Sequence, residues 1–528
     1  MKILVADKIA KEGLKILEAG GDFQVDFKPE ITKEELVESI TDYDALVIRS
    51  RSKVPAEVLE NAGNLKVVGR AGVGLDNVDI PTATRLGIIV MNTPDGNTIS
   101  AAEHTVSLMM ALSRNVAQAD KSMKEGRWDK KKLAGVEVFG KTLGVIGLGR
   151  IGRHVAKCSA AMEMRVIAYD PQVSPEQVKK LGIESATLEE IIKESDYITV
   201  HTPLNDATRG LIGAEQFKYM KKTVRIINCA RGGIIDEQAL INALEEDKIA
   251  GAAVDVFTKE PLPGDSPLRN APNLLLTPHL GASTAEAQEK VAVQIAQQIV
   301  SVLKGGEIIN AVNAPSIDPE LLEVMRPYLN LAESLGRFSS RYAESRIIKI
   351  TCSYSGEVLE FPLEPITTAV VKGILEPTTD ITVNYVNAPN LARERGIEIV
   401  ESRSSQQFQY TNLISVETED EKGTKNKVCG TLYTKEMPRL VILNDRHFNA
   451  YPEGNMLVIR NKDVPGIIGA VATILGNHGI NIAQMSWGRS KPLGDAKTII
   501  NMDQAISPDV VKEIGALKDV LSVRFLVV

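Results

Sequence analysis

Four cysteines in 528 residues, no excess of positive charge and no long apolar run are the main absences in this sequence. The cysteines are widely spaced, form no CxxC pair and have no histidine at the spacing that a zinc site needs. We therefore expect no resident metal and interpret them as reduced structural thiols. They are Cys158, Cys229, Cys352 and Cys429.

The charge balance and the length of the apolar runs argue against two classes of protein, nucleic-acid binders and membrane-spanning proteins. Lysine and arginine number 61 against 68 aspartate and glutamate residues, a net charge of −7, whereas a general nucleic-acid binder carries a strongly basic domain or stripe. No stretch approaches the roughly 20 apolar residues of a membrane span. Residues 1–7 form a short apolar run ended by an acid, which predicts a first β-strand rather than a signal peptide. We expect a soluble, cytoplasmic protein that binds neither nucleic acid nor membrane.

The order of the apolar segments predicts two α/β lobes. A first series has strands at 3–5, 45–48, 65–69 and 88–91, with a helix at 10–18, and such alternation is typical of a parallel sheet covered by helices. A largely apolar helix at 100–114 connects it to a second series. That series has six strands, as a Rossmann-type sheet has, at 142–146, 165–169, 197–201, 225–228, 251–256 and 273–277.

A helix expected at 284–303 can carry the chain back to the first lobe. We therefore assign residues 1–97 plus 287–315 to the first lobe and residues 98–286 to the second. Pro315 and Pro319 then mark a change of character, and residues 316–454 contain mixed α/β segments without a chemical motif.

The last segment, residues 455–528, follows the βαββαβ order of ferredoxin-like domains. Its elements are expected at 456–460, 467–477, 480–486, 497–502, 508–516 and 521–528. The predicted fold is thus α/β, with two Rossmann-like doubly wound lobes, the first discontinuous in sequence, then a small mixed α/β domain and a ferredoxin-like domain.

A glycine motif in the second lobe indicates a dinucleotide site. Gly147, Gly149 and Gly152 follow an apolar strand and open a helix, which is the context that gives the GxGxxG pattern its meaning. Glycines allow a tight turn and close backbone approach, and the helix N-terminus favours a pyrophosphate. Asp170 ends the next strand, where a carboxylate accepts hydrogen bonds from ribose hydroxyls and repels a 2′-phosphate. The pattern favours NAD over NADP, and the alternative is a plain glycine-rich turn with a helix-capping aspartate.

Three residues further along suggest carboxylate recognition and proton transfer. Arg231 follows a strand and precedes two glycines, so a turn can aim its planar guanidinium at a carboxylate. His279 follows another strand, and Glu260 lies in a proline-rich turn. A carboxylate beside the histidine would favour the imidazolium form, which can donate a proton to a carbonyl. Taken singly, the three would be an ion-paired arginine, a structural histidine and a solvated loop acid.

These motifs, together with residues 68–77 and 92–97, resemble the D-isomer-specific 2-hydroxyacid dehydrogenases, and specifically the long type that ends in an ACT domain. The resemblance covers residues 1–315 strongly and 456–528 clearly. It implies that Arg231 anchors the substrate carboxylate and that Glu260 and His279 form the acid/base pair. It also places around NAD the residues Arg150, Ile151, Asp170, Thr202, Cys229, Ala230, Arg231, Asp255, His279, Leu280, Gly281 and Ala282.

The substrate needs a separate argument, because many 2-hydroxy acids share these residues. Arg49 and Arg70 end two strands of the first lobe, which places cationic groups suited to a phosphate at one sheet edge. The resemblance implies Arg49, Arg70 and Asn97 as substrate contacts. It also implies NAD-dependent oxidation of 3-phospho-D-glycerate to 3-phosphooxypyruvate, the first step of L-serine biosynthesis. The alternatives are another 2-hydroxy acid, such as glyoxylate, D-lactate or 2-hydroxyglutarate, and an NAD-sensing corepressor.

By the same resemblance, the C-terminal domain binds an amino acid. Asp463 would hold the amine and Asn481 the polar backbone groups of the effector, with L-serine as the expected feedback inhibitor. A purely structural dimerising module is the alternative, since a fold alone does not imply ligand binding. Residues 316–454 would form a second regulatory domain, with an anion site at Arg439, Arg446 or His447. Paired domains of this kind imply a homo-oligomer, either a dimer or a tetramer.

Overall fold

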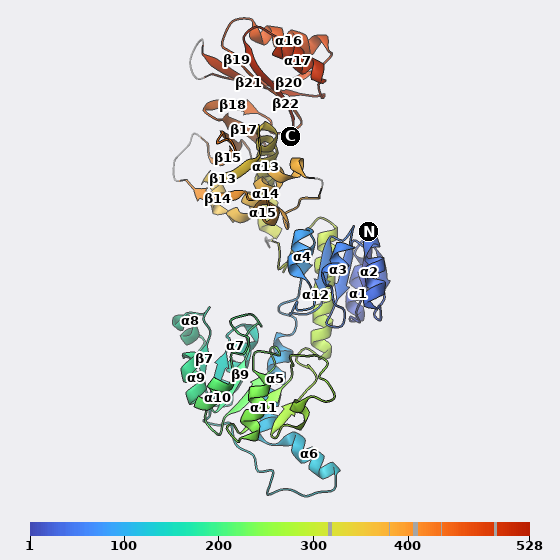
Figure 1. Cartoon of the computed structure of the whole chain (residues 1–528), viewed down its shortest axis with the longest axis vertical. Helices are drawn as coiled ribbons and strands as arrows, with labels where there is room; N and C mark the ends of the chain where they lie inside the picture. The colour runs from blue at the N-terminus through green and yellow to red at the C-terminus, as the bar shows by residue number, and fades with distance from the viewer. Residues whose placement is uncertain (315–318, 380, 405–409, 435, 490–493) are drawn as a thin grey trace.

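The computed structural model describes residues 1–528 except 315–318, 380, 405–409, 435 and 490–493. The expected Pro315 boundary falls outside the described residues. These residues form four sheets, and Figure 1 shows them in an elongated arrangement with the C-terminal sheet at one end. None of the described helices is long and apolar enough to cross a membrane.

The first sheet has five parallel strands in the order β2-β1-β3-β4-β5. The strands are β1 (Lys2–Val5), β2 (Gln24–Phe27), β3 (Ala45–Ile48), β4 (Val67–Arg70) and β5 (Ile89–Met91), and the helices are α1 (Lys11–Ala19), α2 (Lys33–Ser39), α3 (Ala56–Glu60) and α4 (Ile80–Arg85). Strand β2 was not expected from the sequence. It is an edge strand whose residues are only partly buried or exposed, so it lacks the apolar run that marks its neighbours.

Helix α12 (Ala285–Leu303) returns to this sheet. Val291, Ile295 and Ile299 are buried in one cluster with Ile3 and Val5. Figure 1 shows this long helix beside α1, with which it packs on one face of the sheet. The core of the first sheet is therefore built from segments almost 300 residues apart in the chain.

The second sheet has seven parallel strands in the order β12-β11-β10-β9-β6-β7-β8, which is the Rossmann order extended by one strand. The strands are β6 (Thr142–Ile146), β7 (Arg165–Tyr169), β8 (Glu184–Ser185), β9 (Tyr197–Val200), β10 (Arg225–Asn228), β11 (Gly251–Val254) and β12 (Leu274–Leu276). Six strands were expected. The additional one, β8, is an exposed edge strand of two residues, too short to leave a periodic signal.

Helices cover both faces of this sheet. They are α5 (Thr98–Ser113), α6 (Val116–Lys124), α7 (Arg150–Ala161), α8 (Pro175–Lys180), α9 (Leu188–Glu194), α10 (Ala214–Tyr219) and α11 (Glu237–Glu245). Helix α5 starts where the chain leaves the first sheet, and its Ser100 Oγ lies 2.8 Å from Thr284 Oγ1, the residue before α12. The two chain crossings between the lobes are therefore adjacent.

The third sheet is mixed and has six strands in the order β14-β13-β15-β16-β17-β18. Helices α13 (Pro319–Tyr342), α14 (Leu363–Leu375) and α15 (Ala388–Glu394) accompany β13 (Ile347–Gly356), β14 (Glu398–Arg403), β15 (Asn412–Asp420), β16 (Lys425–Leu432), β17 (Pro438–Leu443) and β18 (Arg446–Ala450). The polar stretch at 417–427 is part of the antiparallel pair β15 and β16. These two strands form a regular antiparallel hairpin.

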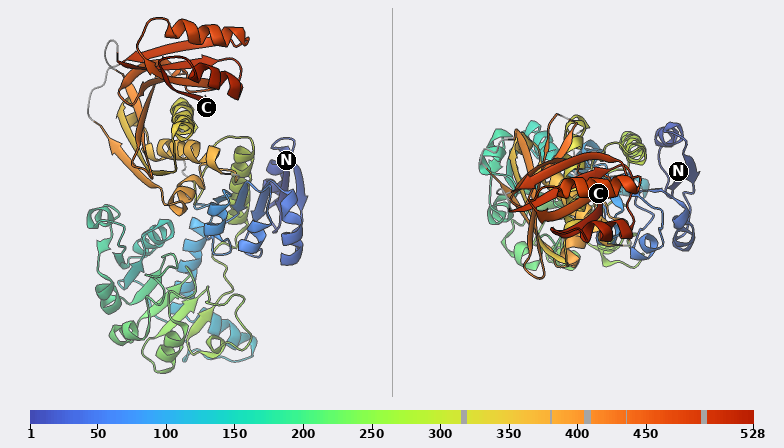
Figure 2. Two further views of the ribbon diagram at one scale, coloured as in Figure 1. Left: turned by 45° about the horizontal axis from the view of Figure 1, so that its top comes forward. Right: turned by 90° about the horizontal axis from the view of Figure 1, so that it is seen from above.

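The fourth sheet is antiparallel, in the order β20-β21-β19-β22. Its elements are β19 (Asn455–Lys462), α16 (Ile467–Asn477), β20 (Ile482–Arg489), β21 (Asp495–Met502), α17 (Pro508–Gly515) and β22 (Val520–Val527). Helices α16 and α17 cover one face, as Figure 2 shows, while Met456, Val458 and Ile499 are buried in one cluster with residues of the third sheet's unit. The expected fold class is confirmed.

Candidate active site

The expected cofactor and catalytic residues lie at one edge of the second sheet. Gly147, Asp170, Thr202, Arg231, Asp255 and His279 all follow the carboxyl ends of parallel strands. In open α/β sheets this edge lines the ligand crevice. The first sheet places Arg49 and Arg70 at its own carboxyl edge, since β3 and β4 are neighbours with Ile48 opposite Arg70.

Glu260 and His279 form a direct pair. Glu260 Oε2 lies 2.7 Å from His279 Nδ1, and Oε1 accepts the Phe257 backbone N–H at 2.9 Å. Burial would raise the pKa of Glu260, but the hydrogen bonds from His279 and Phe257 outweigh it and hold the pKa below its ordinary value. Glu260 therefore stays a carboxylate near neutral pH and leaves His279 Nε2 as the ring nitrogen directed away from it.

Buried Asp255 holds the loop that carries His279. Its carboxylate accepts the Thr277 hydroxyl at 2.6 Å and the backbone N–H groups of Leu280 and Gly281 at 2.8 and 3.0 Å. His279 itself has a left-handed backbone, with φ of 54°, and its N–H bonds the Asp255 carbonyl at 2.8 Å. A strained conformation at a reactive residue persists only where the surroundings fix it, and Asp255 supplies that constraint.

His104 was not identified from the sequence as part of this network. Its Nε2 lies 3.1 Å from Asp255 Oδ1. Burial alone would raise the pKa of Asp255, but hydrogen bonds from His104 and Thr277 hold it below the ordinary value. His104, Cys229 and Asp255 also bring possible metal ligands within 4.8 Å of one another. Burial raises the pKa of the Cys229 thiol to about 12, so this thiol is protonated near neutral pH and is not an activated nucleophile.

A tight turn aims Arg231. The Asn228 side chain bonds both ends of the turn, accepting the Ala230 N–H at 3.0 Å and donating to the Arg231 carbonyl at 2.9 Å. A Cβ on Gly232 would overlap the Phe257 backbone, and Gly233 has φ of 85°. The two glycines therefore allow the Arg231 turn to pack against the segment that leads to Glu260.

Arg231 reaches across to the first lobe. Its Nε donates to Asp76 Oδ2 at 3.0 Å, and its Nη1 donates to the Ala230 carbonyl at 2.7 Å. A Cβ on Gly74 would overlap Arg231 Nη2, so the first lobe's backbone lies directly against the guanidinium. The contact to Asp76 was not foreseen, because nothing in the local sequence relates residues 155 positions apart.

The first lobe contributes two more arginines, Arg49 and Arg70, near Arg231. Burial, and then the neighbouring charges of Arg231 and Arg49, lower the pKa of Arg70 to about 10. Burial also lowers the pKa of Arg49. Arg70 Nε and Asn97 Oδ1 are buried and have no hydrogen-bond partner among the described residues. Three arginines thus converge from two lobes, and Arg70 Nε is a donor without a partner among the described residues, which suits a small polyanion.

The glycine motif has the geometry that a dinucleotide requires. Gly147 has φ of 96°, and a Cβ on Gly152 would overlap the Gly147 carbonyl oxygen. A Cβ on Gly149 would meet nothing within 4 Å, so the middle glycine faces open space at the start of α7. Two glycines are therefore needed for the turn itself, and the third leaves room for a phosphate.

The remaining cofactor candidates surround this turn. Asp170 accepts the N–H groups of Leu148 at 2.7 Å and Gln172 at 2.8 Å. Thr202 Oγ1 is buried without a partner among the described residues. Arg150 pairs at 2.5 Å with Asp95 of the first lobe. Ile151 and Cys229 pack against one apolar cluster, and Ala230, Leu280, Gly281 and Ala282 lie in the loops after β10 and β12.

His201 competes with His279 for the role of base but is unsuited to it. It follows β9 beside the glycine motif, and its Nε2 lies 3.0 Å from Thr199 Oγ1. Burial lowers the pKa of His201 to about 4, so it stays neutral and does not exchange a proton near neutral pH.

The expected effector residues lie at one end of the fourth sheet. Asp463 follows β19 and accepts Arg489 Nη1 at 3.1 Å. Asn481 precedes β20, and its Nδ2 donates to Asp503 at 2.6 Å. Both side chains are therefore engaged within the chain.

A cationic cavity of about 310 Å³ lies between the third and fourth sheets. Arg446, Arg460, Lys497 and Arg524 line it, with Glu344 as its acid, and Arg446 Nε is buried without a partner among the described residues. Of the three anion-site candidates, Arg446 lines this cavity. Arg439 instead stacks 3.7 Å from the Tyr451 ring centroid, and His447 is exposed.

Comparisons with known proteins agree with this geometry. Residues 106–281 match the family model of the D-isomer specific 2-hydroxyacid dehydrogenase NAD binding domain, residues 324–444 the D-3-phosphoglycerate dehydrogenase intervening domain, and residues 455–519 the ACT domain. The D-3-phosphoglycerate dehydrogenase of Methanocaldococcus jannaschii is 44% identical over 98% of this chain and 99% of its own. That of Archaeoglobus fulgidus is 43% identical over the full length of both. A crystal structure of a Thermus thermophilus protein superposes with a TM-score of 0.55 and 34% identity, covering 59% of this chain and all of its own.

Two nucleotide-type sheets, a glycine cradle and an arginine beside a carboxylate–histidine pair define a D-isomer-specific 2-hydroxyacid dehydrogenase that uses NAD. With its intervening and ACT domains and its full-length relatives, the chain belongs to the D-3-phosphoglycerate dehydrogenases within that family. The expected family and the expected cofactor are confirmed.

Proposed function

We propose that this protein catalyses the NAD-dependent oxidation of 3-phospho-D-glycerate to 3-phosphooxypyruvate, the first step of the phosphorylated route to L-serine. The observation that carries the proposal is the convergence of Arg49 and Arg70 from the first lobe on Arg231 of the second, beside the Glu260–His279 pair. A phosphorylated hydroxy acid has a charge at each end and a hydroxyl between them. These residues supply cations for both charged ends and a base for the hydroxyl.

Each side chain has a distinct task. Arg231 holds the substrate carboxylate, since Nη1 and Nη2 still offer N–H groups beyond those given to Asp76 and Ala230. His279, as a neutral ring with Nδ1–H donated to Glu260, takes the hydroxyl proton at Nε2, and Glu260 stabilises the imidazolium that forms. In the reverse direction the imidazolium returns the proton. NAD, when bound, supplies the acceptor for the hydride of the substrate C–H bond.

Arg49, Arg70 and Asn97 would hold the phosphate end. Arg49 and Arg70 are partly buried, and the repulsion among them and Arg231 is relieved by a dianion, whereas an uncharged group would leave it uncompensated. This argument disfavours glyoxylate and D-lactate as the main substrates. The cofactor contacts proposed are the glycine motif, Arg150, Asp170, Thr202 and the loops after β10, β11 and β12.

The regulatory part of the proposal concerns L-serine and self-association. We place serine at Asp463 and Asn481 and an anion at the cavity lined by Arg446. Trp128 is 78% exposed and Phe139 64% exposed, on the segment between α6 and β6. Large exposed apolar side chains favour a protein interface, and we assign this one to a second copy of the chain. We propose domains at 1–97 plus 287–315, 98–286, 316–454 and 455–528, and a cytoplasmic location.

The test is the rate of NADH formation with purified protein and 3-phospho-D-glycerate, D-glycerate, D-lactate or 2-hydroxyglutarate, each with and without millimolar L-serine. A preference for the phosphorylated acid that serine reduces supports both parts of the proposal. Equal rates on unphosphorylated acids refute the phosphate argument. NAD binding without turnover on any of them favours a corepressor-like role.

A further inference from the structure

A buried carboxylate at the end of β1 is not used by the proposed chemistry. Asp7 is 2% exposed and follows the strand directly, at the carboxyl edge where Arg49 and Arg70 lie. A buried carboxylate is stable only when its oxygens are well bonded. The partners of Asp7 therefore indicate its purpose.

Within the described part of the chain, this carboxylate accepts four hydrogen bonds, and all of them come from residues 49–52. Oδ2 accepts the N–H of Arg49 at 2.5 Å and that of Ser52 at 3.2 Å. Oδ1 accepts the Ser52 hydroxyl at 2.7 Å and Arg51 Nε at 3.3 Å. The turn after β3 is thus anchored to the end of the neighbouring strand β1.

Arg49 is held at both of its ends. Its backbone N–H donates to the Asp7 carboxylate, and its Nη1 donates at 3.0 Å to the carbonyl of Lys8, the residue that follows Asp7. Charge acts together with these bonds, because the Asp7 carboxylate opposes the effect of burial on the Arg49 guanidinium. An arginine held in this way can face Arg70 without being driven off by like charge.

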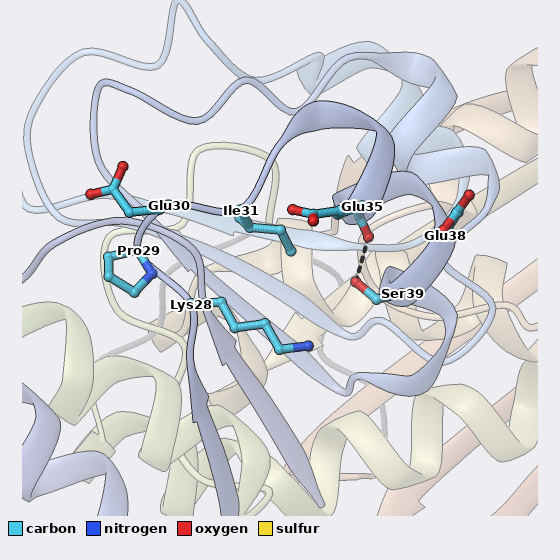
Figure 3. Close-up of a pocket in the computed structure, with 7 residues that line it drawn as sticks. All are labelled: Lys28, Pro29, Glu30, Ile31, Glu35, Glu38 and Ser39. Carbon is cyan, nitrogen blue, oxygen red and sulfur yellow. Dashed lines mark hydrogen bonds between the residues drawn. The ribbon is translucent and has the colours of Figure 1, made fainter.

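Arg51 is directed elsewhere. Its Nη2 donates to the carbonyls of Ala6 at 3.2 Å and Ile31 at 3.1 Å, and its Nη1 lies 3.8 Å from Glu30. Ile31 and Glu30 line a groove of about 620 Å³ between the end of β2 and helix α2, shown in Figure 3. The segment therefore contains two arginines that contact different parts of the first lobe, and the hydrogen bonds to Asp7 fix which arginine takes which position.

We propose that Asp7 is a positioning residue for the phosphate end of the substrate, acting by fixing the 49–52 turn so that Arg49, rather than Arg51, faces the cleft. The inference rests on the proposed function, because it takes Arg49 as a phosphate contact. Asp7 does not touch the reacting atoms. Its removal should affect recognition of phosphorylated ligands and leave the proton-transfer pair intact.

The experiment compares Asp7→Ala and Asp7→Asn with Asp44→Asn. Asp44 is a matched control, since it also bonds a backbone N–H across this sheet, that of Lys2 at 2.8 Å, but lies at the opposite end of β3. The readouts are kcat, KM for 3-phospho-D-glycerate, the inhibition constant of oxalate and the dissociation constant of NADH. Oxalate serves as an anion that Arg231 can hold without a phosphate.

We expect Asp7→Ala to raise KM for 3-phospho-D-glycerate about tenfold or more, as the loss of one charge-assisted contact implies, with kcat and the oxalate and NADH constants within about twofold of wild type. The KM of Asp7→Asn should lie between those of wild type and Asp7→Ala, and the KM of Asp44→Asn should match that of wild type. The proposal is overturned if KM, the oxalate inhibition constant and the NADH dissociation constant all rise together in Asp7→Ala, or if KM is unchanged.

Two further measurements keep the outcomes separate. If Asp7→Ala does not fold, Ser52→Ala removes only one of the four bonds, and a rise in KM of about two- to threefold with unchanged oxalate inhibition is then required. If the wild-type protein does not oxidise 3-phospho-D-glycerate, the proposed function fails by itself. Calorimetric binding of inorganic phosphate to wild type and Asp7→Asn then decides the inference: equal affinity overturns it, and weaker binding by the variant supports it.

Discussion

Replacing Glu260 by glutamine tests the proton-transfer pair directly, because the change keeps the shape of the side chain and removes its charge. Glu260 bonds His279 Nδ1 at 2.7 Å and the Phe257 N–H at 2.9 Å. A glutamine can accept from only one of them. If its oxygen stays on Phe257, its NH2 group faces Nδ1 and selects the ring tautomer that carries hydrogen on Nε2, which cannot take the substrate proton.

The magnitude follows from the loss of charge. A hydrogen bond to a charged group contributes about 1.5–3 kcal/mol, against about 0.5–1.5 for a neutral one. The side chains are 45% and 36% exposed, so solvent screening places the difference at the low end, about 1.4 kcal/mol, or about tenfold in rate. We expect kcat for the oxidation to fall about tenfold or more.

The assay is initial-rate NADH formation across the pH range at saturating NAD, with unfolding followed separately to confirm an intact fold. Glu237→Gln is the matched control. This glutamate supports the same turn by accepting the Thr258 N–H at 2.6 Å, and its recorded bond does not involve His279. A Glu260→Gln protein with kcat within twofold of wild type across this pH range would refute the assigned roles.

Four other changes test the rest of the site. Asp170→Ala should raise the KM for NAD about tenfold while improving use of NADP, as measured with both cofactors. Gly152→Ala should abolish NADH binding by fluorescence titration, because its Cβ overlaps the Gly147 carbonyl; retained affinity would contradict the cradle. Asp255→Asn should lower the free energy of unfolding by about 2 kcal/mol at neutral pH. Because the folded-state pKa of Asp255 is depressed, this contribution is present above its unfolded pKa of about 3.9 and is lost as the pH falls below it, so chemical denaturation at several pH values checks the sign. Trp128→Ser with Phe139→Ser should reduce the molar mass seen by light scattering, and an unchanged mass would remove this surface from the proposed self-association.

Most of the fold could be read from local pattern. Helix 467–477 was expected with the bounds that the structure has, because its apolar residues recur at helical spacing between clear turn residues. The glycine motif and the residues that end each buried strand could also be predicted from the sequence. The sequence pattern did not predict β2 and β8. Both are exposed edge strands that bury no face, so their sequences show no alternation of apolar and polar residues.

The site divides in the same way. Arg231 and His279 were predicted because each follows a strand, and Glu260 because its proline-rich turn can bring a carboxylate to that histidine. Asp7, Asp76 and His104 were not, because each acts through a partner distant in sequence: Arg49, Arg231 and Asp255 respectively. No periodicity or motif encodes such a pairing.

The sequence by itself determined the order of the buried strands in both lobes and the cofactor class, and it proposed the residues that can carry the chemistry. Those properties depend on local periodicity, on glycine geometry and on which side chains follow a strand. Only the tertiary structure decided which backbone carbonyls the two arginines of the 49–52 turn contact and which carboxylates hold the loops after β3 and β12. Those choices depend on hydrogen bonds and charges between strand ends brought together when both lobes fold.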